Sequence, residues 1–133
     1  TPFWQIDFPL LNYRLAPWLT HAQSLDGLYY WTLVYWPESK DPWTNPLSVR
    51  EYNGEGVLFY PGAAAGVAGP VATLRLKALR DGLEDYEYLI LAGAAAPDIV
   101  AGIGRSWTDW DSDPEKLLAA REALAKLIVA GKK

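Results

Sequence analysis

The chain has 133 residues, half of them hydrophobic, and at this length one ordinary core and one globular unit are expected. The formal net charge of −4 at pH 7, with Lys and Arg scattered along the chain, argues against a nucleic-acid partner, and no run of residues predicts a membrane span. Cysteine is absent and His21 is the only histidine, which excludes disulfides and a metal site built from His or Cys ligands, and no cofactor is expected.

The first predicted element is a helix that begins near Asp7 and Pro9 and ends near Ser24. Its apolar residues recur at spacings of three and four, at Leu11, Leu15, Trp18, Leu19 and Ala22. Pro17 lies inside this pattern and predicts a kink or an early break of the helix.

Two strands are predicted next. Residues 26–36 begin with an Asp-Gly turn. The rest of the range is rich in aromatic and β-branched residues and nearly free of charge, which predicts a strand buried on both faces. A loop rich in Pro and polar residues, PESKDPWTNP at 37–46, leads to a second short buried strand at 56–60, bracketed by glycines. Because a long helix follows, we expect these strands to pair in parallel in an α/β sheet.

That helix begins at Pro70 and ends near residue 92, with an apolar stripe at Leu76, Leu79, Leu83, Tyr86 and Ile90. Residues 79–89 carry four acids, which form either a catalytic cluster or the solvated side of the helix. Asp81 and Asp85 point almost directly away from the stripe, so we expect them to face water. Glu87 borders the stripe and is expected to pair with a neighbouring base, and the missing side chain of Gly82 permits another backbone to come close.

Residues 93–112 predict a connector with one short helix. A last helix begins with Asp113 as its N-cap and Pro114 at its first position, and it ends at Gly131. Leu117, Leu124 and Ile128 share one of its faces.

Seven Trp and eight Tyr residues are an unusually high number for a small acidic chain. Each of these rings joins a large apolar face to a polar group, so they suit a solvated cleft as well as a core. The C–H face of a sugar ring can lie on such a flat surface. The aromatic surplus therefore favours carbohydrate binding, although only modestly by itself.

Four motifs together resemble the C-terminal part of the catalytic domain of glycoside hydrolase family 123, the N-acetyl-β-galactosaminidase family. They are DGLYYWTLVYW at 26–36, DPW at 41–43, GEGVLFYPG at 54–62 and RLKALRDGLEDYEYL at 75–89, and the likeness covers residues 4–91. The resemblance implies a (β/α)₈ barrel, which needs about 250 residues. Residues 1–92 would then be the last part of the barrel, and residues 93–133 a connector and helix packed on it.

In such a barrel the chemistry gathers at the C-terminal ends of the strands, and the outer helices are scaffold. The acidic run 79–89 is then mostly scaffold. The same rule places the predicted sugar-contacting residues at or beyond the end of the first strand: Trp31, Tyr35, Trp36, Asp41 and Trp43. Core packing is the alternative for the aromatic residues. For Asp41 the alternative is a cap on the turn before Pro42, and we expect His21 to be a surface residue.

The resemblance implies a substrate-assisted retaining mechanism, in which the acetamido oxygen of the sugar attacks the anomeric carbon and an adjacent Asp-Glu pair assists. No Asp-Glu dipeptide occurs in these 133 residues, and Glu84-Asp85 has the reverse order on another element. We therefore assign no catalytic residue, place the pair upstream, and expect this chain alone to be inactive.

The expected partner is an N-acetylhexosaminide glycan, and export to the periplasm or the outside of the cell is implied only by the resemblance. The alternative function is a non-catalytic carbohydrate-binding or structural module on the same fold. An Asp-Glu pair at a strand end upstream of Thr1 would distinguish the two. The sugar, its linkage and the oligomeric state stay open.

Overall fold

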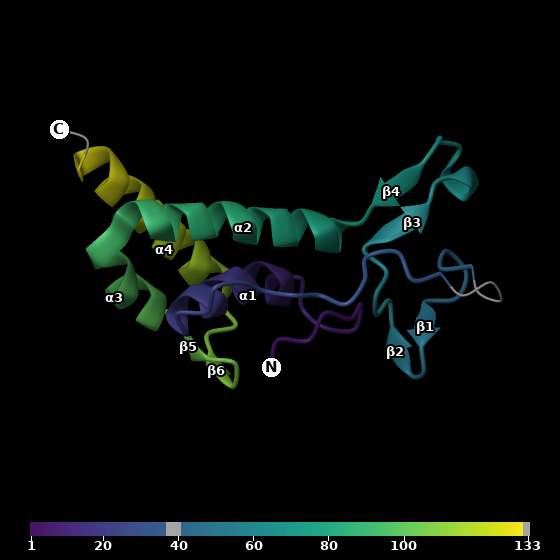
Figure 1. Ribbon diagram of the computed structural model, residues 1–133, viewed down its shortest axis with the longest axis horizontal. Helices are drawn as coiled ribbons and strands as arrows, with labels where there is room; N and C mark the ends of the chain where they lie inside the picture. Colours follow the sequence, from purple (N-terminus) through teal and green to yellow (C-terminus); the bar gives the residue numbers. More distant parts are fainter. Residues whose placement is uncertain (37–40, 132–133) are drawn as a thin grey trace.

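Figure 1 shows the computed structural model, which describes residues 1–36 and 41–131. The helices and one short hairpin occupy one end of the molecule, and the two other hairpins occupy the opposite end. Of the described residues, 48% lie in helices and 14% in strands, so the structure is mixed and consistent with the predicted α/β class. The α-helices are α1 (Leu11–Ala22), α2 (Leu74–Ala92), α3 (Ala96–Ala101) and α4 (Pro114–Gly131), and the 3₁₀ turns are η1 (Ala63–Ala65) and η2 (Gly93–Ala95).

The strands form three separate antiparallel pairs. They are β1 (Leu47–Val49) with β2 (Tyr52–Asn53), β3 (Phe59–Pro61) with β4 (Pro70–Ala72), and β5 (Gly104–Ser106) with β6 (Asp109–Trp110). The predicted parallel pairing is wrong, because the two predicted strands meet at an antiparallel bridge between Val34 and Val57. A parallel pair requires a crossover connection, and the chain between them instead turns back through the β1–β2 hairpin.

The predicted buried strand at 26–36 is also wrong. Among the described residues, the backbone of this segment bonds to the chain near residue 57 only at Leu33 and Tyr35, through Tyr35 N to Gly56 O at 2.8 Å and through Leu58 N and Phe59 N to Leu33 O at 2.8 and 3.1 Å. Most of its large side chains are exposed, up to 86% for Tyr29, whereas Tyr30 and Trp36 are partly buried. The second predicted strand, at 56–60, is partly correct: Val57 and Leu58 are buried, and the strand β3 begins directly after them. Residues 37–40 of the predicted loop lie outside the described residues.

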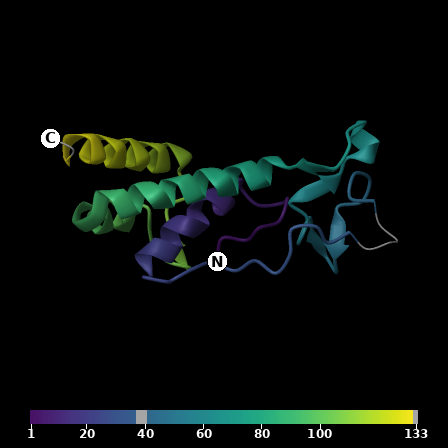
Figure 2. The same cartoon turned by 45° about the horizontal axis from the view of Figure 1, so that its top comes forward.

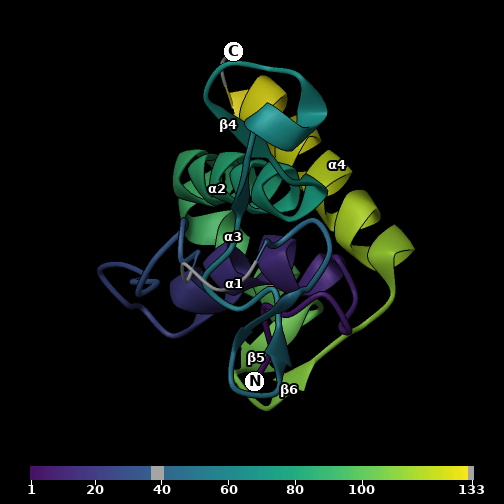
Figure 3. The ribbon, with the colours of Figure 1, turned by 90° about the vertical axis from the view of Figure 1, so that its right-hand side faces the viewer.

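Helix α1 is the centre of the molecule. As predicted, it is helical in the region of Leu11 to Ala22, and it continues through Pro17 without the early break. Asp7 does not cap it, because its carboxylate accepts hydrogen bonds from the Asn53 amide at 2.9 and 3.0 Å. Fully buried side chains of α1 join α2, α3 and α4 in one core, to which Leu15, Trp18, Leu19, Leu89, Leu117 and Leu124 contribute. Figures 2 and 3 show α4 running alongside the C-terminal half of α2, with α1 beneath.

Helix α2 begins later than predicted and buries a different face. Pro70 belongs to β4, and the hydroxyl of Thr73 caps the helix by accepting from Leu76 N at 3.2 Å. Leu83 and Ile90 of the predicted stripe are about half exposed, and the buried residues are Arg75, Gly82, Asp85 and Leu89. The prediction for Gly82 is confirmed, because a Cβ atom there would lie 2.5 Å from the Arg14 carbonyl oxygen. This backbone contact with α1 decides which face of α2 is buried.

Asp85 is fully buried, so the prediction that it faces water is wrong. Its carboxylate accepts from Arg14 Nε at 2.7 Å and Nη2 at 3.1 Å, and from Trp18 Nε1 at 3.0 Å. Arg121 Nε lies 2.6 Å from the other side of the carboxylate as an ion pair. These partners come from α1 and α4, which the pattern of a single helix does not reveal. The hydrogen bond and the negative charge of Asp85 raise the pKa of Arg14.

The other acids of the run remain near the solvent. Asp81 pairs with Arg80 at 2.7 Å, and Glu84 lies 3.5 Å from Arg80 and 3.7 Å from Arg121. Glu87 is exposed. The run is therefore one buried structural carboxylate among solvated ones, which agrees with the scaffold interpretation.

The C-terminal elements follow the prediction closely. Helix α3 is the short helix of the connector, and Asp113 caps α4 by accepting from Glu115 N at 2.9 Å. Leu117 and Leu124 are buried in the core, and α4 ends at Gly131. None of the helices in 1–36 and 41–131 has the length and hydropathy needed to cross a bilayer.

Replacing Asp85 by Asn should lower the free energy of unfolding by about 3 to 5 kcal/mol, because two guanidinium groups lose their buried anion. Asp81→Asn is the control on the same helix, and its exposed pair should cost less than about 1 kcal/mol. Urea unfolding followed by circular dichroism measures both values. Equal effects of the two substitutions would contradict the structural role of Asp85.

Candidate functional site

An open groove with a volume of about 540 Å³ lies where three segments of the chain meet. These segments are the residues before α1, the extended segment 26–36 and the β1–β2 hairpin with the loop after it. The lining side chains are mainly aromatic or apolar: Phe3, Gln5, Phe8, Trp31, Val49, Tyr52 and Glu55. Such a volume is typical of small-molecule sites.

The N-terminal wall of the groove is an aromatic pair tied to the hairpin. The rings of Phe3 and Phe8 lie 5.2 Å apart, and both side chains are at least 40% exposed. Between them, Ile6 N donates to Asn53 O at 3.0 Å, close to the bonds from Asn53 to Asp7. These hydrogen bonds hold the N-terminal segment against β2.

Trp31 of the segment 26–36 also lines the groove. Its indole is 44% exposed and lies 5.1 Å from the ring of Tyr35, so these two predicted site residues do come together. Gly56 has a φ of +70°, and a Cβ atom there would lie 2.6 Å from the edge of the Trp31 ring. Glycine therefore serves both the left-handed turn and the close approach of the indole.

Glu55 is the charged group of the groove, and its neighbours hold its carboxylate in place. Its Oε1 atom accepts hydrogen bonds from Trp31 Nε1 at 3.0 Å and from the Tyr30 hydroxyl at 3.2 Å. The amide of Gln5 donates to Oε2 over a longer distance, 3.4 Å. Ser48 Oγ donates to the backbone carbonyl of Glu55 at 2.5 Å, which anchors the loop to β1.

The Tyr30 hydroxyl also accepts from Gly56 N at 2.8 Å, so its own proton is directed at Glu55. Burial raises the pKa of Tyr30 well above its usual range, and the negative charge of Glu55 raises it further. Tyr30 therefore keeps its proton at neutral pH and remains a donor to the carboxylate.

The other three predicted site residues lie apart from this groove. Trp36 Nε1 donates to Phe59 O at 2.9 Å and Trp43 Nε1 to Pro61 O at 2.8 Å, along the free edge of β3. The ring of Trp43 meets that of Tyr60 edge-on at 4.9 Å. Asp41 Oδ1 accepts from Trp43 N at 3.0 Å, which is the turn cap considered above for this residue.

Sequence reasoning missed Glu55, Gln5 and the N-terminal aromatic residues. One signal was available for Glu55, since a lone acid between two glycines at the start of a buried strand marks a loop that carries a specific side chain. Phe3 and Phe8 had no comparable signal, because their role depends on how the N-terminal segment folds back onto β2.

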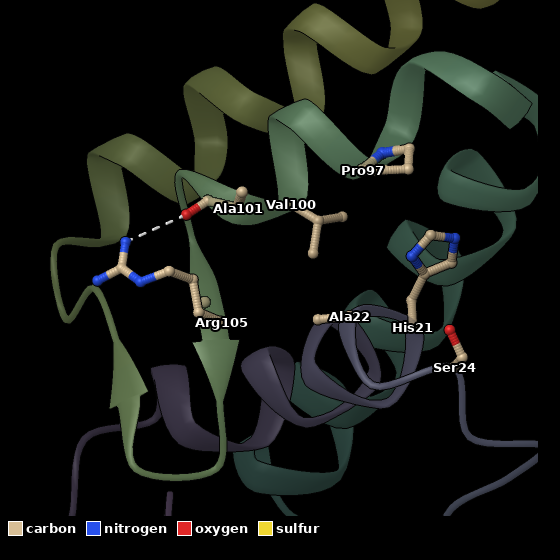
Figure 4. A pocket seen from close by; sticks show the side chains of 8 residues that line it. His21, Ala22, Ser24, Pro97, Val100, Ala101 and Arg105 are labelled. Carbon is tan, nitrogen blue, oxygen red and sulfur yellow. Dashed lines mark hydrogen bonds between the residues drawn. The ribbon is translucent and has the colours of Figure 1, made fainter.

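A second hollow, of about 300 Å³, lies between α1, α3 and β5, as Figure 4 shows. Arg105 on its rim is already neutralised by Asp109, with contacts of 2.7 and 2.8 Å. His21 lines this hollow at the surface and meets the Tyr86 ring edge-on at 5.9 Å. Across 1–36 and 41–131, no cluster of three or more His, Asp or Glu side chains is arranged to hold a metal ion.

Residues 5–92 match the sequence profile of the family described as glycoside hydrolase 123, catalytic domain. The chain belongs to this family. The predicted resemblance over 4–91 is thereby confirmed. A search of curated proteins finds no match.

The part of the chain that matches glycoside hydrolase family 123 includes Trp31, Tyr35 and Glu55, so most of the groove belongs to the family's catalytic domain. Family membership makes a carbohydrate the expected class of substrate. Helices α3 and α4 and the β5–β6 hairpin lie after the matched residues.

Alkaline titration tests the buried hydroxyl at the groove. Above pH 10 the unfolded chain loses the Tyr30 proton while the folded chain keeps it, so the free energy of unfolding should fall as pH rises toward the raised pKa. The stability that the raised pKa of Tyr30 contributes is fully present below the ordinary pKa of tyrosine.

In Tyr30→Phe this alkaline fall in the free energy of unfolding should be smaller. A pH titration followed by the absorbance of ionised tyrosine should lose the rise at the highest pH. Tyr29→Phe is the control, because the Tyr29 side chain is 86% exposed. An unchanged titration in Tyr30→Phe would show that the hydroxyl is not buried as described.

Proposed function

We propose that this chain is the C-terminal part of a glycoside hydrolase catalytic domain that acts on N-acetylhexosamine-containing glycans, and that its groove binds the sugar. The observation that carries the proposal is the exposed indole of Trp31 beside the fixed carboxylate of Glu55. An aromatic face packs on the C–H face of a pyranose, and a carboxylate accepts hydrogen bonds from its hydroxyl groups. The second aromatic patch, with Trp36, Asp41 and Trp43, stays a predicted contact for a longer glycan.

The proposed chemistry is substrate-assisted and retaining, as the family resemblance implies. It requires a carboxylate that orients the acetamide and another that protonates the leaving oxygen. Within the chain, Glu84-Asp85 is the nearest approach to the required dipeptide, and Asp85 is occupied by Arg14, Trp18 and Arg121. We therefore place the catalytic pair upstream of these residues and assign none of them a catalytic role.

The exposed segment 26–36 supports a barrel for the complete domain. It carries apolar side chains that are 38% to 86% exposed: Leu28, Tyr29, Trp31, Leu33, Val34 and Tyr35. In a (β/α)₈ barrel this segment would be a strand between two neighbours. Residues 1–92 then form the last part of the barrel, and residues 93–133 are the connector and helix that pack on it.

A non-catalytic carbohydrate-binding module is the second candidate. The observation that favours it is that the groove is formed entirely by residues of this chain, with no Asp-Glu pair among the 133 residues. On either proposal the chain alone binds sugar and hydrolyses none. Export from the cell remains a proposal drawn from the family resemblance.

Sugar binding tests the groove. Titration with methyl N-acetyl-β-galactosaminide and methyl N-acetyl-β-glucosaminide, followed by calorimetry, should show saturable binding. Trp31→Ala should weaken the affinity about tenfold or more, which corresponds to about 1.4 kcal/mol. Trp43→Ala replaces an equally exposed indole outside the groove and should change the affinity less than about threefold. The groove is refuted as the binding site if Trp43→Ala has the larger effect.

Hydrolysis by the complete domain tests the enzyme assignment. The reading frame extended upstream should yield a protein that cleaves an aryl N-acetyl-β-galactosaminide or N-acetyl-β-glucosaminide. Replacing its adjacent Asp and Glu by Asn and Gln should abolish turnover, since neither amide can perform the acid or orienting role. A parent without such a pair and without turnover would leave the binding module.

A further inference from the structure

We infer that the groove selects uncharged sugars and that Glu55 is the residue that rejects sulfated and uronic-acid units. The inference rests on the proposed function, namely that the groove binds carbohydrate. It adds a charge criterion to that function, drawn from the side chains around the groove.

Among the described residues that line the groove, Glu55 carries the only charge. Arg75 is the nearest buried cation, and its guanidinium is committed to Gly54 O at 2.8 Å, to Val57 O and to Tyr13 Oη. Arg50 lies at the tip of the β1–β2 hairpin, followed directly by the acidic Glu51. The groove thus presents a negative charge with no lining cation to bind an anionic ligand.

The hydrogen bonds around Glu55 hold it as an acceptor. The indole Nε1 of Trp31 can only donate, and the Tyr30 proton is directed at the same carboxylate oxygen because the hydroxyl already accepts from Gly56 N. Three protein donors therefore contact the carboxylate, Trp31 and Tyr30 at Oε1 and Gln5 at Oε2.

One of the two carboxylate oxygens remains able to bind a ligand. A carboxylate has about four acceptor sites, and Oε1 uses two of them for Trp31 and Tyr30. Oε2 receives only the long 3.4 Å contact from Gln5. A sugar hydroxyl can donate to Oε2 while the ring lies on Trp31, whereas a sulfate or carboxylate in that position offers no proton and repels Glu55.

The test compares neutral and charged ligands on the same protein. Calorimetry or NMR titration measures the affinity of wild type, Glu55→Gln and Glu51→Gln for methyl N-acetyl-β-galactosaminide and its 4-sulfated and 6-sulfated derivatives. Wild type should bind the neutral sugar at least about tenfold more tightly than either sulfated one, because like charges in contact oppose binding. Glu55→Gln should reduce this ratio to less than about threefold, and Glu51→Gln should leave it unchanged.

The possible outcomes distinguish the charge selection by Glu55 from the proposed binding of carbohydrate in the groove. Sulfated sugars that bind wild type as tightly as the neutral sugar would overturn the charge selection and leave the carbohydrate site intact. An unchanged ratio in a folded Glu55→Gln would overturn the role of Glu55. Failure of all three ligands to bind would overturn both the inference and the proposed function. The comparison of ligands on wild type decides the charge selection even if Glu55→Gln does not fold.

Discussion

The buried carboxylate of Asp85 is the interaction on which the arrangement of the helices depends. It accepts hydrogen bonds from Arg14 and Trp18 of α1 and pairs with Arg121 of α4. A carboxylate removed from water requires compensation on all sides, and only one relative placement of three helices supplies it. The apolar core around Leu89 would tolerate small shifts, whereas these charged contacts with distances near 2.7 Å would not. Asp85 therefore contributes more to the specificity of the packing than to its net stability.

Arg75, at the other end of the buried face of α2, extends this constraint to the groove. Its guanidinium binds the carbonyl oxygens of Gly54 and Val57, which flank Glu55 and Gly56. The chain direction at Glu55 is thus determined by a helix that contributes no side chain to the groove itself. Two polar residues on one helix, Arg75 and Asp85, connect the helical core to the groove.

Sequence patterns predicted the local elements well and their packing poorly. Helices α1, α2 and α4 were found because periodicity, prolines and caps are local properties. The cap of α4 at Asp113 was predicted correctly, whereas α2 was predicted to begin at Pro70 and is capped by Thr73 instead. The buried face of α2 was not found, because two partner cations and a close backbone contact at Gly82 outweigh the leucine stripe. Similarly, residues 26–36 have the composition of a buried strand, yet composition does not specify which segment covers it.

The candidate site shows the same limit. Trp31 and Tyr35 were predicted to share one face of a strand, but residues four apart in a straight strand are separated by about 13 Å. Their rings lie 5.1 Å apart because the chain bends at Trp31 and Leu33. Glu55 and Gln5 are 50 residues apart in sequence and meet only after the N-terminal segment has folded onto β2. Of the residues that line the groove, only Trp31 was predicted from the sequence, and the others are brought to it by tertiary structure.

The separation of Asp85 from its partners also has a kinetic consequence. Arg14 and Trp18 precede Asp85 by 71 and 67 residues, so α1 has no counterion until α2 has formed and returned to it. Contacts of such large sequence separation form late, because a long loop must close first. During synthesis the groove residues leave the ribosome before the helix that orders them. The groove is therefore expected to be among the last parts of the molecule to acquire its final geometry.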